Sequence, residues 1–117
     1  MQVRVIRGSA SQGQEFAALQ FTNTGPARCV LYGYPSVTLL RAGNAIGRPA
    51  QPSGDKASRR ELTPGATAES QLHDYTNCSA ALSDSLRVSV PGSSQSAVRP
   101  AELRACTLRV DALAAPA

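Results

Sequence analysis

The chain has 117 residues, the size of one ordinary domain, so it can bury a core without relying wholly on covalent crosslinks. Its hydrophobic fraction of 42% is normal for a globular protein, whereas aromatic residues make up 4% and tryptophan is absent. The formal net charge is +4, but the basic residues are scattered, and only Arg59 and Arg60 are adjacent. Because nucleic-acid binders usually gather their charge beside stacking aromatics, we do not expect nucleic acid as a partner. No apolar run approaches the roughly 20 residues that would form a transmembrane helix.

The first part of the chain alternates between apolar and polar residues in short segments. Val3 and Val5 open a strand, and residues 8–14 form a loop by composition. Residues 17–22 alternate again and predict a half-buried strand, which the turn at residues 23–26 ends. The next strand is expected over residues 29–34, where Pro35 stops it.

The middle of the chain continues the pattern with one long interruption. Residues 37–40 are extended, and residues 42–45 predict a tight hairpin turn. The stretch from Arg48 to Arg60 is polar and rich in Pro, Gly and Ser, so we expect the longest loop there, and the most mobile one. Residues 66–75 alternate again and predict a strand with Ala68, Ser70 and Leu72 on one face.

The last part predicts a hairpin and one further strand. Residues 86–90 alternate clearly, residues 91–94 form a turn, and residues 97–99 return as the second strand. Residues 108–112 alternate once more, and residues 114–117 form an Ala- and Pro-rich tail that we expect to fray.

About eight short strands with frequent Pro and Gly punctuation, and no helical period over three turns, predict an all-β fold. We expect an Ig-like two-sheet antiparallel β-sandwich, formed by residues 1–113 as a single domain.

The three cysteines, Cys29, Cys78 and Cys106, are widely spaced and form no close pair. Zinc sites need closely spaced ligands, and the carboxylates form no calcium-loop pattern, so we expect no metal. A reactive thiol or a disulfide remains, and we favour one disulfide with one cysteine left over.

Three blocks of residues resemble a known family in their order along the chain. They are Phe21-Thr22-Asn23-Thr24-Gly25 with Cys29, Gly33-Tyr34-Pro35 and Val37; Leu62-Thr63-Pro64-Gly65 with Ala68; and Cys78, Leu86-Arg87-Val88, Cys106 and Leu108-Arg109-Val110. This arrangement is similar to that of the actinobacterial domain-of-unknown-function family 4232, over nearly the whole chain.

The resemblance implies an exported protein or lipoprotein of Gram-positive, high-GC bacteria with an Ig-like sandwich and no established catalytic residues. We therefore expect an extracytoplasmic location, no enzymatic activity and no cofactor. Met1 leads directly into Gln2 and Val3, so we expect an export segment to have preceded this sequence.

Family members often carry a further cysteine at the start of the domain, and this chain lacks it. We expect Cys29 to be unpaired, or its partner to have been removed with the preceding segment. The antiparallel hairpin of residues 86–90 and 97–99 should bring Cys78, which precedes it, close to Cys106, which follows it. We therefore predict a Cys78–Cys106 disulfide.

Two places are candidates for a binding surface. Tyr32 and Tyr34 flank Gly33 and should share one strand face, where an aromatic pair can recognise a ligand, although packing within the sheet is the commoner role. Arg59 and Arg60 lie in the predicted long loop, and such loops often carry binding residues.

Other polar residues predict less. His73 is the only histidine, and its neighbour Asp74 should point to the opposite face of the strand, so we expect His73 at a surface or edge rather than in catalysis. Arg4, Arg87 and Arg109 take outward positions and would form a basic ladder if their strands were neighbours, although a solvated face is the commoner outcome.

The sequence thus predicts an interaction module at the cell envelope, whose partner is a protein or a cell-wall polymer. A structural spacer with no specific ligand is the alternative, and an unrecognised enzyme is a third.

Overall fold

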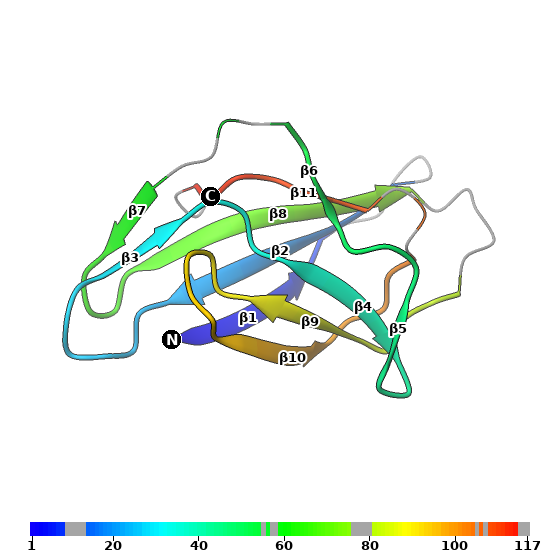
Figure 1. Cartoon of the computed structure of the whole chain (residues 1–117), viewed down its shortest axis with the longest axis horizontal. Helices are drawn as coiled ribbons and strands as arrows, with labels where there is room; N and C mark the ends of the chain where they lie inside the picture. Colours follow the sequence, from blue (N-terminus) through cyan, green and yellow to red (C-terminus); the bar gives the residue numbers. More distant parts are fainter. Residues whose placement is uncertain are drawn as a thin grey trace.

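The computed structural model describes residues 1–8, 14–54, 56, 59–75, 81–104, 106 and 108–114, without the side chains of Arg7 and Tyr75. Within these ranges eleven strands form three sheets, and no helix is present (Figure 1). The five-stranded sheet has the order β1 (Gln2–Arg7), β2 (Gln14–Thr22), β8 (Thr67–Tyr75), β11 (Arg109–Val110) and β6 (Gln51–Pro52). The four-stranded sheet has the order β10 (Ser96–Pro100), β9 (Ser85–Ser89), β4 (Val37–Arg41) and β5 (Asn44–Ile46). The third sheet pairs β3 (Cys29–Tyr32) with β7 (Arg59–Leu62).

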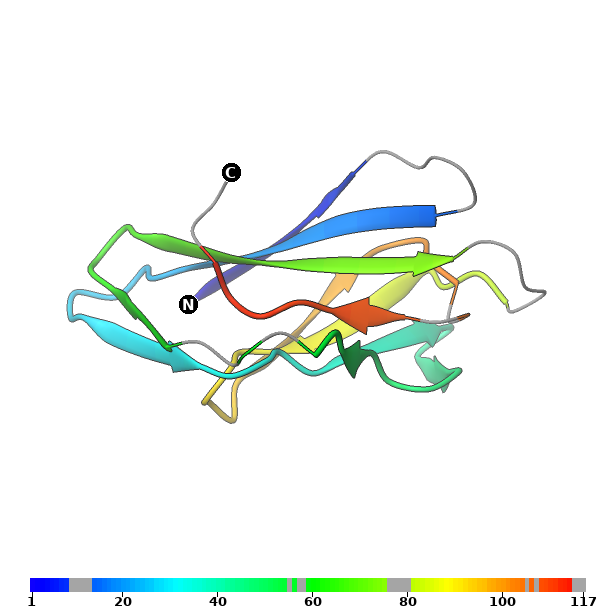
Figure 2. The ribbon, with the colours of Figure 1, turned by 90° about the horizontal axis from the view of Figure 1, so that it is seen from above.

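One hydrophobic core joins the larger sheets, whose strands lie in two layers in Figure 2. Alternate residues of β2 and β8 face this core, including Leu19, Phe21 and Leu72, each at most 1% exposed. Leu39 of β4 and Leu86 of β9 meet them from the other layer and are fully buried. Period-two alternation therefore places the apolar residues as expected, and the predicted all-β class is confirmed.

The sheet arrangement corrects the predicted number of sheets and strands and the predicted direction of strand pairing. There are three sheets rather than two and, in the described residues, eleven strands rather than about eight. The sheets are also not wholly antiparallel, since β11 pairs with β6 in parallel. The additional strands are short and mostly exposed, as β6 and β7 show, so their polar composition resembles that of loops.

The predicted long loop from Arg48 to Arg60 is wrong for this reason. It contains β6 and the first half of β7. Gln51 N donates to Leu108 O, and Ser53 N donates to Val110 O, both at 3.0 Å. Pro52 between them cannot donate, which an edge strand tolerates.

The predicted hairpins are confirmed. β9 and β10 pair antiparallel, with Val88 opposite Ala97 and Leu86 opposite Arg99. β4 and β5 pair across a tight turn at Ala42 and Gly43.

The basic ladder is not formed. Arg4 lies on β1 and Arg109 on β11, which β2 and β8 separate within the five-stranded sheet, and Arg87 lies on β9 in the four-stranded sheet. Sheet order, which alternation does not encode, decides which outward residues become neighbours.

Candidate functional site: the outer face of β3 and β7

The two candidate regions of the sequence meet in the smallest sheet. β3 and β7 pair antiparallel, so that Tyr32 lies opposite Arg59 and Val30 lies opposite Glu61. Alternation turns these four side chains to solvent, and we call them the β3–β7 face. Tyr32 is 59% exposed and Val30 is 41% exposed, and they are two of the four exposed large hydrophobic residues in the described part of the chain.

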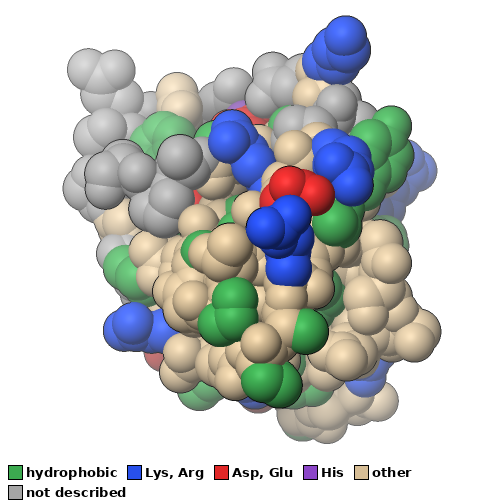
Figure 3. All heavy atoms as spheres, turned by 90° about the vertical axis from the view of Figure 1, so that its left-hand side faces the viewer, with side chains coloured by type: hydrophobic (Ala, Val, Ile, Leu, Met, Phe, Trp, Pro, Cys, Tyr) green, Lys and Arg blue, Asp and Glu red, His purple; other side chains and the backbone are tan. Residues whose placement is uncertain are grey.

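Charged side chains surround the apolar pair. Glu61 lies between two arginines, with carboxylate-to-guanidinium distances of 3.9 Å to Arg28 and 3.8 Å to Arg59. Each arginine side chain is more than 60% exposed, so water screens these ion pairs and they hold the guanidinium groups weakly. Figure 3 views the end of the molecule where β3 and β7 lie, and it shows an acidic side chain among basic ones, with hydrophobic side chains nearby. The arginines can therefore turn toward an incoming partner.

Asn23 anchors β3 to β7 from below. Its side chain is 5% exposed and donates from Nδ2 to Ala27 O at 2.8 Å and to Leu62 O at 2.9 Å. Its Oδ1 accepts from Gly25 N at 3.0 Å. One side chain thus fixes the turn that leads into β3 and the last residue of β7. The sequence marked Asn23 only as a turn residue.

The loop of the β9–β10 hairpin supports the same face from behind. A Cβ added to Gly92 would lie 3.4 Å from Tyr32 N and 3.5 Å from Tyr32 O, and the backbone φ of Gly92 is +76°. A side chain would fit at these distances, so the positive φ of the turn is the reason that glycine is favoured at this position. A hollow of about 310 Å³ opens beside it, and its lining includes Val30, Ser93 and Gln95.

Two of the four predicted surface residues lie elsewhere. Gly33 adopts a φ of +92° and ends β3, so Tyr34 does not share a face with Tyr32. Tyr34 is half-buried and packs against the core, which corrects the expected aromatic pair. Arg60 alternates inward, and its Nε is buried without a hydrogen-bond partner in the described residues.

The cysteine pattern is tested only in part. Cys29 is a half-buried free thiol opposite Leu62 on β7. Cys78 lies outside the described residues, so the Cys78–Cys106 pairing stays a prediction. Cys106 N donates to Asp74 Oδ2 at 3.0 Å, which places Cys106 against the end of β8.

His73 and Asp74 point to opposite faces of β8, as alternation predicts. His73 is half-buried on this central strand, rather than at an edge, with Nε2 3.4 Å from Asp111 Oδ1 and its ring centroid 6.3 Å from that of Phe16. Asp74 is 1% exposed on the inner side, a burial that the sequence did not indicate.

The described residues form neither a metal-binding cluster nor a membrane-spanning helix. They contain no group of three His, Cys, Asp or Glu side chains placed to hold a metal ion. None of the described segments forms a helix of the length and apolarity that crossing a membrane requires.

Comparison with known proteins gives one result. The model of a family described as "Domain of unknown function (DUF4232)" matches residues 1–114. This chain belongs to the DUF4232 family. The resemblance seen in the sequence is thereby confirmed at the level of the family. No curated protein and no solved structure matches the chain. For this DUF4232 domain, the β3–β7 face is the site where exposed apolar and charged side chains converge.

Proposed function

We propose that this DUF4232 domain is a non-catalytic interaction module of the cell envelope that binds a protein through the β3–β7 face. The observation that carries the proposal is the direct cross-strand pairing of exposed Tyr32 with exposed Arg59. Interface cores are enriched in tyrosine and arginine, and binding energy concentrates in such residues.

The geometry of the face supports a protein partner with acidic groups around an apolar contact. Tyr32 and Val30 offer apolar area on a sheet, so little side-chain entropy is lost when they are covered. Arg28 and Arg59 can exchange their weak pairs with Glu61 for carboxylates of the partner. Four side chains are fewer than a standard interface contains, so we expect the face to act as a hot spot within a larger or transient contact.

The envelope location rests on the sequence. The family resemblance implies export, and the predicted Cys78–Cys106 disulfide suits an oxidising compartment. The cross-linking experiment is therefore carried out in the organism that produces the protein, where any envelope partner is present.

Photo-crosslinking tests the proposal. A benzoylphenylalanine replaces Tyr32 in the protein as the organism produces it, and a matched control carries the same probe at Val98, which is 49% exposed on β10. We expect a discrete cross-linked protein from position 32 and none from position 98. Arg59→Ser should abolish this product while leaving the thermal stability unchanged, because the Arg59 side chain is exposed.

Three outcomes would contradict the proposal. The same product from both positions would indicate non-specific contact. A heterogeneous product that a cell-wall hydrolase removes would replace the protein partner with a wall polymer. No product from position 32 would favour the spacer.

A further inference from the structure

The side chain of Arg99 is held in place by two backbone carbonyl groups. Its Nε donates to Val3 O and its Nη1 donates to Val98 O, each at 2.9 Å. The first of these bonds joins β10 to β1, the end strands of the two larger sheets. Because a guanidinium group is planar, two such bonds fix its orientation. Arg99 is therefore an ordered cation between the two sheets.

The charge of Arg99 has no counter-charge among the described residues. No described carboxylate lies within 4.0 Å of Arg99 or of the exposed Arg4, whereas Arg28 and Arg59 each pair with Glu61. A guanidinium group has five N–H donors, and the two carbonyl groups use two of those of Arg99. Three donors of an ordered cation are thus available to a ligand.

Arg99 lines a hollow of about 450 Å³, together with Pro100 and with Gln2–Val5 of β1, and we call this the Arg99 hollow. Arg4 is the other charged residue of its lining, which contains no carboxylate. β1 and β10 also have no acidic residue along their lengths. The two positive charges are therefore not neutralised by the residues that surround the hollow.

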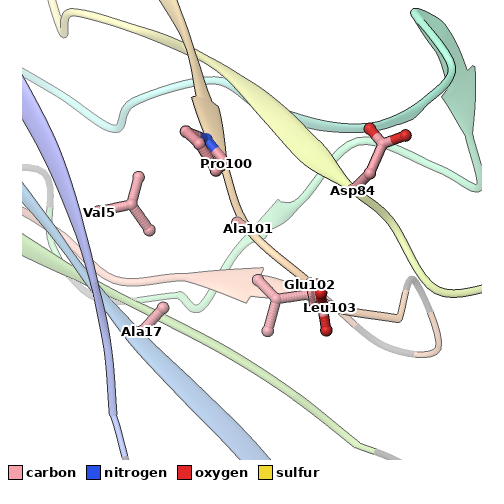
Figure 4. A pocket seen from close by; sticks show the side chains of 7 residues that line it. All are labelled: Val5, Ala17, Asp84, Pro100, Ala101, Glu102 and Leu103. Atoms are coloured by element: carbon pink, nitrogen blue, oxygen red, sulfur yellow. The ribbon is translucent and has the colours of Figure 1, made fainter.

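A smaller hollow of about 270 Å³ adjoins the Arg99 hollow and differs from it in charge. Val5 and Pro100 line both hollows. Ala17 adds apolar surface to the smaller one, and Asp84 and Glu102 belong to its lining (Figure 4). Positive charge is thus confined to one hollow and negative charge to the other, with apolar side chains where they meet.

We infer that the Arg99 hollow binds the phosphate group of a small phosphate monoester. The available N–H groups of Arg99 would donate to phosphate oxygens, whose geometry the planar guanidinium group matches. Arg4 is long and exposed, so it can turn toward the same group. A phosphate monoester carries a charge between about −1.5 and −2 near neutral pH, which two arginines balance better than they balance a single carboxylate. The bonds from Arg99 to Val3 O and Val98 O stay intact.

The smaller hollow limits what the rest of the ligand can be. Its neutral organic part would lie against Val5 and Pro100, where the two hollows meet. A second phosphate group placed beyond them would be repelled by the carboxylates of Asp84 and Glu102, so the ligand is a monophosphate. The Arg99 hollow shares no residue with the β3–β7 face, so this inference holds or fails independently of the proposed function.

Titration of the ¹⁵N-labelled protein with glycerol 3-phosphate, followed by NMR, tests the inference. The Nε–H of Arg99 is a direct reporter, because its bond to Val3 O slows exchange with water. Glycerol is the matched control, since it lacks only the phosphate group. We expect glycerol 3-phosphate to shift the Arg99 Nε–H signal and the backbone amides of Val3, Arg4 and Val5, and glycerol to shift none of them.

Three variants separate the two arginines from the overall charge. Arg99→Lys keeps the charge but loses the planar group, and it should weaken binding about tenfold. Arg4→Gln should weaken binding about two- to fivefold, the range of an exposed ion pair. Arg48→Gln removes an equally exposed charge that lines a different hollow, and it should leave the affinity unchanged. Arg4 is exposed, so its variant should fold and gives a test even if Arg99→Lys does not.

Other results overturn the inference. Equal shifts with glycerol would exclude recognition of the phosphate group. An equal loss of affinity in Arg4→Gln and Arg48→Gln would indicate a general attraction between the basic protein and an anion. Shifts absent at millimolar glycerol 3-phosphate would exclude the site. Binding to phosphatidylcholine vesicles that contain phosphatidic acid, without binding of the soluble ester, would replace the small ligand with a membrane surface.

Discussion

Asn23 supports the β3–β7 face through contacts to the turn before β3 and to the last residue of β7. Its side-chain amide donates to the backbone carbonyls of Ala27 and Leu62. The bond to Leu62, the last residue of β7, is buried. Its carbonyl oxygen accepts from Gly25 N in the turn before β3. A buried polar group that loses its partner costs the full penalty of desolvation. The position of Tyr32 opposite Arg59 therefore depends on a residue that does not itself belong to the face.

Asn23→Ala should lower the free energy of unfolding by about 2–3 kcal/mol, because it leaves the Leu62 carbonyl buried without its donor. Urea unfolding measures the change as a lower midpoint with an unchanged slope. The neighbouring exposed substitution Thr24→Ala is the control, and it should stay within about 0.5 kcal/mol of the wild type. Equal midpoints for the two variants would show that the amide contacts carry no net stability.

Asp84 joins the β4–β5 turn to the start of β9. Its Oδ2 accepts from Ala42 N and its Oδ1 accepts from Ser85 Oγ, both at 2.9 Å. The hydrogen bond from the Ala42 backbone, followed by the one from Ser85, lowers the pKa of this carboxyl below its ordinary value of 3.8. These bonds stabilise the ionised form in the folded state.

The pH dependence of stability should report this contact. Because the folded pKa of Asp84 lies below the unfolded value, its contribution is present above pH 3.8 and is lost as the pH falls through the folded pKa. Asp84→Asn should therefore be less stable than the wild type at pH about 6, and the gap should narrow by pH about 3. Urea midpoints at both pH values measure it, and a gap that does not change with pH would refute the assignment.

The turn of the β4–β5 hairpin holds Ala42 in a strained backbone conformation. Ala42 has a φ of +50° and Gly43 a φ of +82°, the pattern of a type I′ turn. Alanine is disfavoured in this left-handed region, whereas asparagine followed by glycine is the preferred pair for the turn.

Ala42→Asn should therefore stabilise the protein by about 0.5–1 kcal/mol and raise Tm by about 2–5 °C. Calorimetry measures the shift, and Ala45→Asn on exposed β5 is the matched control, which should be neutral or destabilising. A gain from both variants would indicate a surface effect rather than relief at the turn.

Other elements show how far sequence patterns extend. The alternation of residues 17–22 predicts this part of β2 because one face of the strand is buried and the other is half-buried along these residues. The polar stretch before Leu62 resembles a loop in sequence because β7 carries three charged residues, and pairing with β3 makes it a strand. β3 ends before Tyr34 because Gly33 has a positive φ. The alternation of side chains along the strand does not predict this change of backbone direction.

At the scale of the whole molecule, the number of free thiols tests the predicted disulfide. We predict that alkylation of the native protein labels Cys29, the free thiol, and that Cys78 and Cys106 react only after reduction. Mass mapping of non-reduced fragments should join Cys78 to Cys106. Reduction should then cost roughly 3–4 kcal/mol of stability, because the open loop regains chain entropy on unfolding.

The control is Cys29→Ser, which should not react without reductant. Label on Cys106 in the native protein, or a fragment that joins Cys29 to Cys78, would overturn the pairing. Because Cys29 is half-buried, its alkylation should be slower than that of a free thiol in solution.

The candidate site was predictable only in its parts. Tyr32 and Arg59 were each marked, but as members of a strand and a loop that seemed unrelated. Their pairing depends on the antiparallel register of β3 and β7, which is formed by backbone hydrogen bonds. Asn23 and Asp74 were missed as buried polar residues because burial of a polar group depends on distant partners, here Leu62 and Cys106.

Local alternation in the amino-acid sequence was sufficient for the all-β class, the main strands and the buried faces, because a strand's side chains alternate wherever it is placed. Ordered residue blocks were sufficient for the family. Only the tertiary structure decided the number of sheets and the β3–β7 face. The physical reason is that backbone groups are the same at every residue, so the choice among possible strand partners rests on packing between segments far apart in the chain.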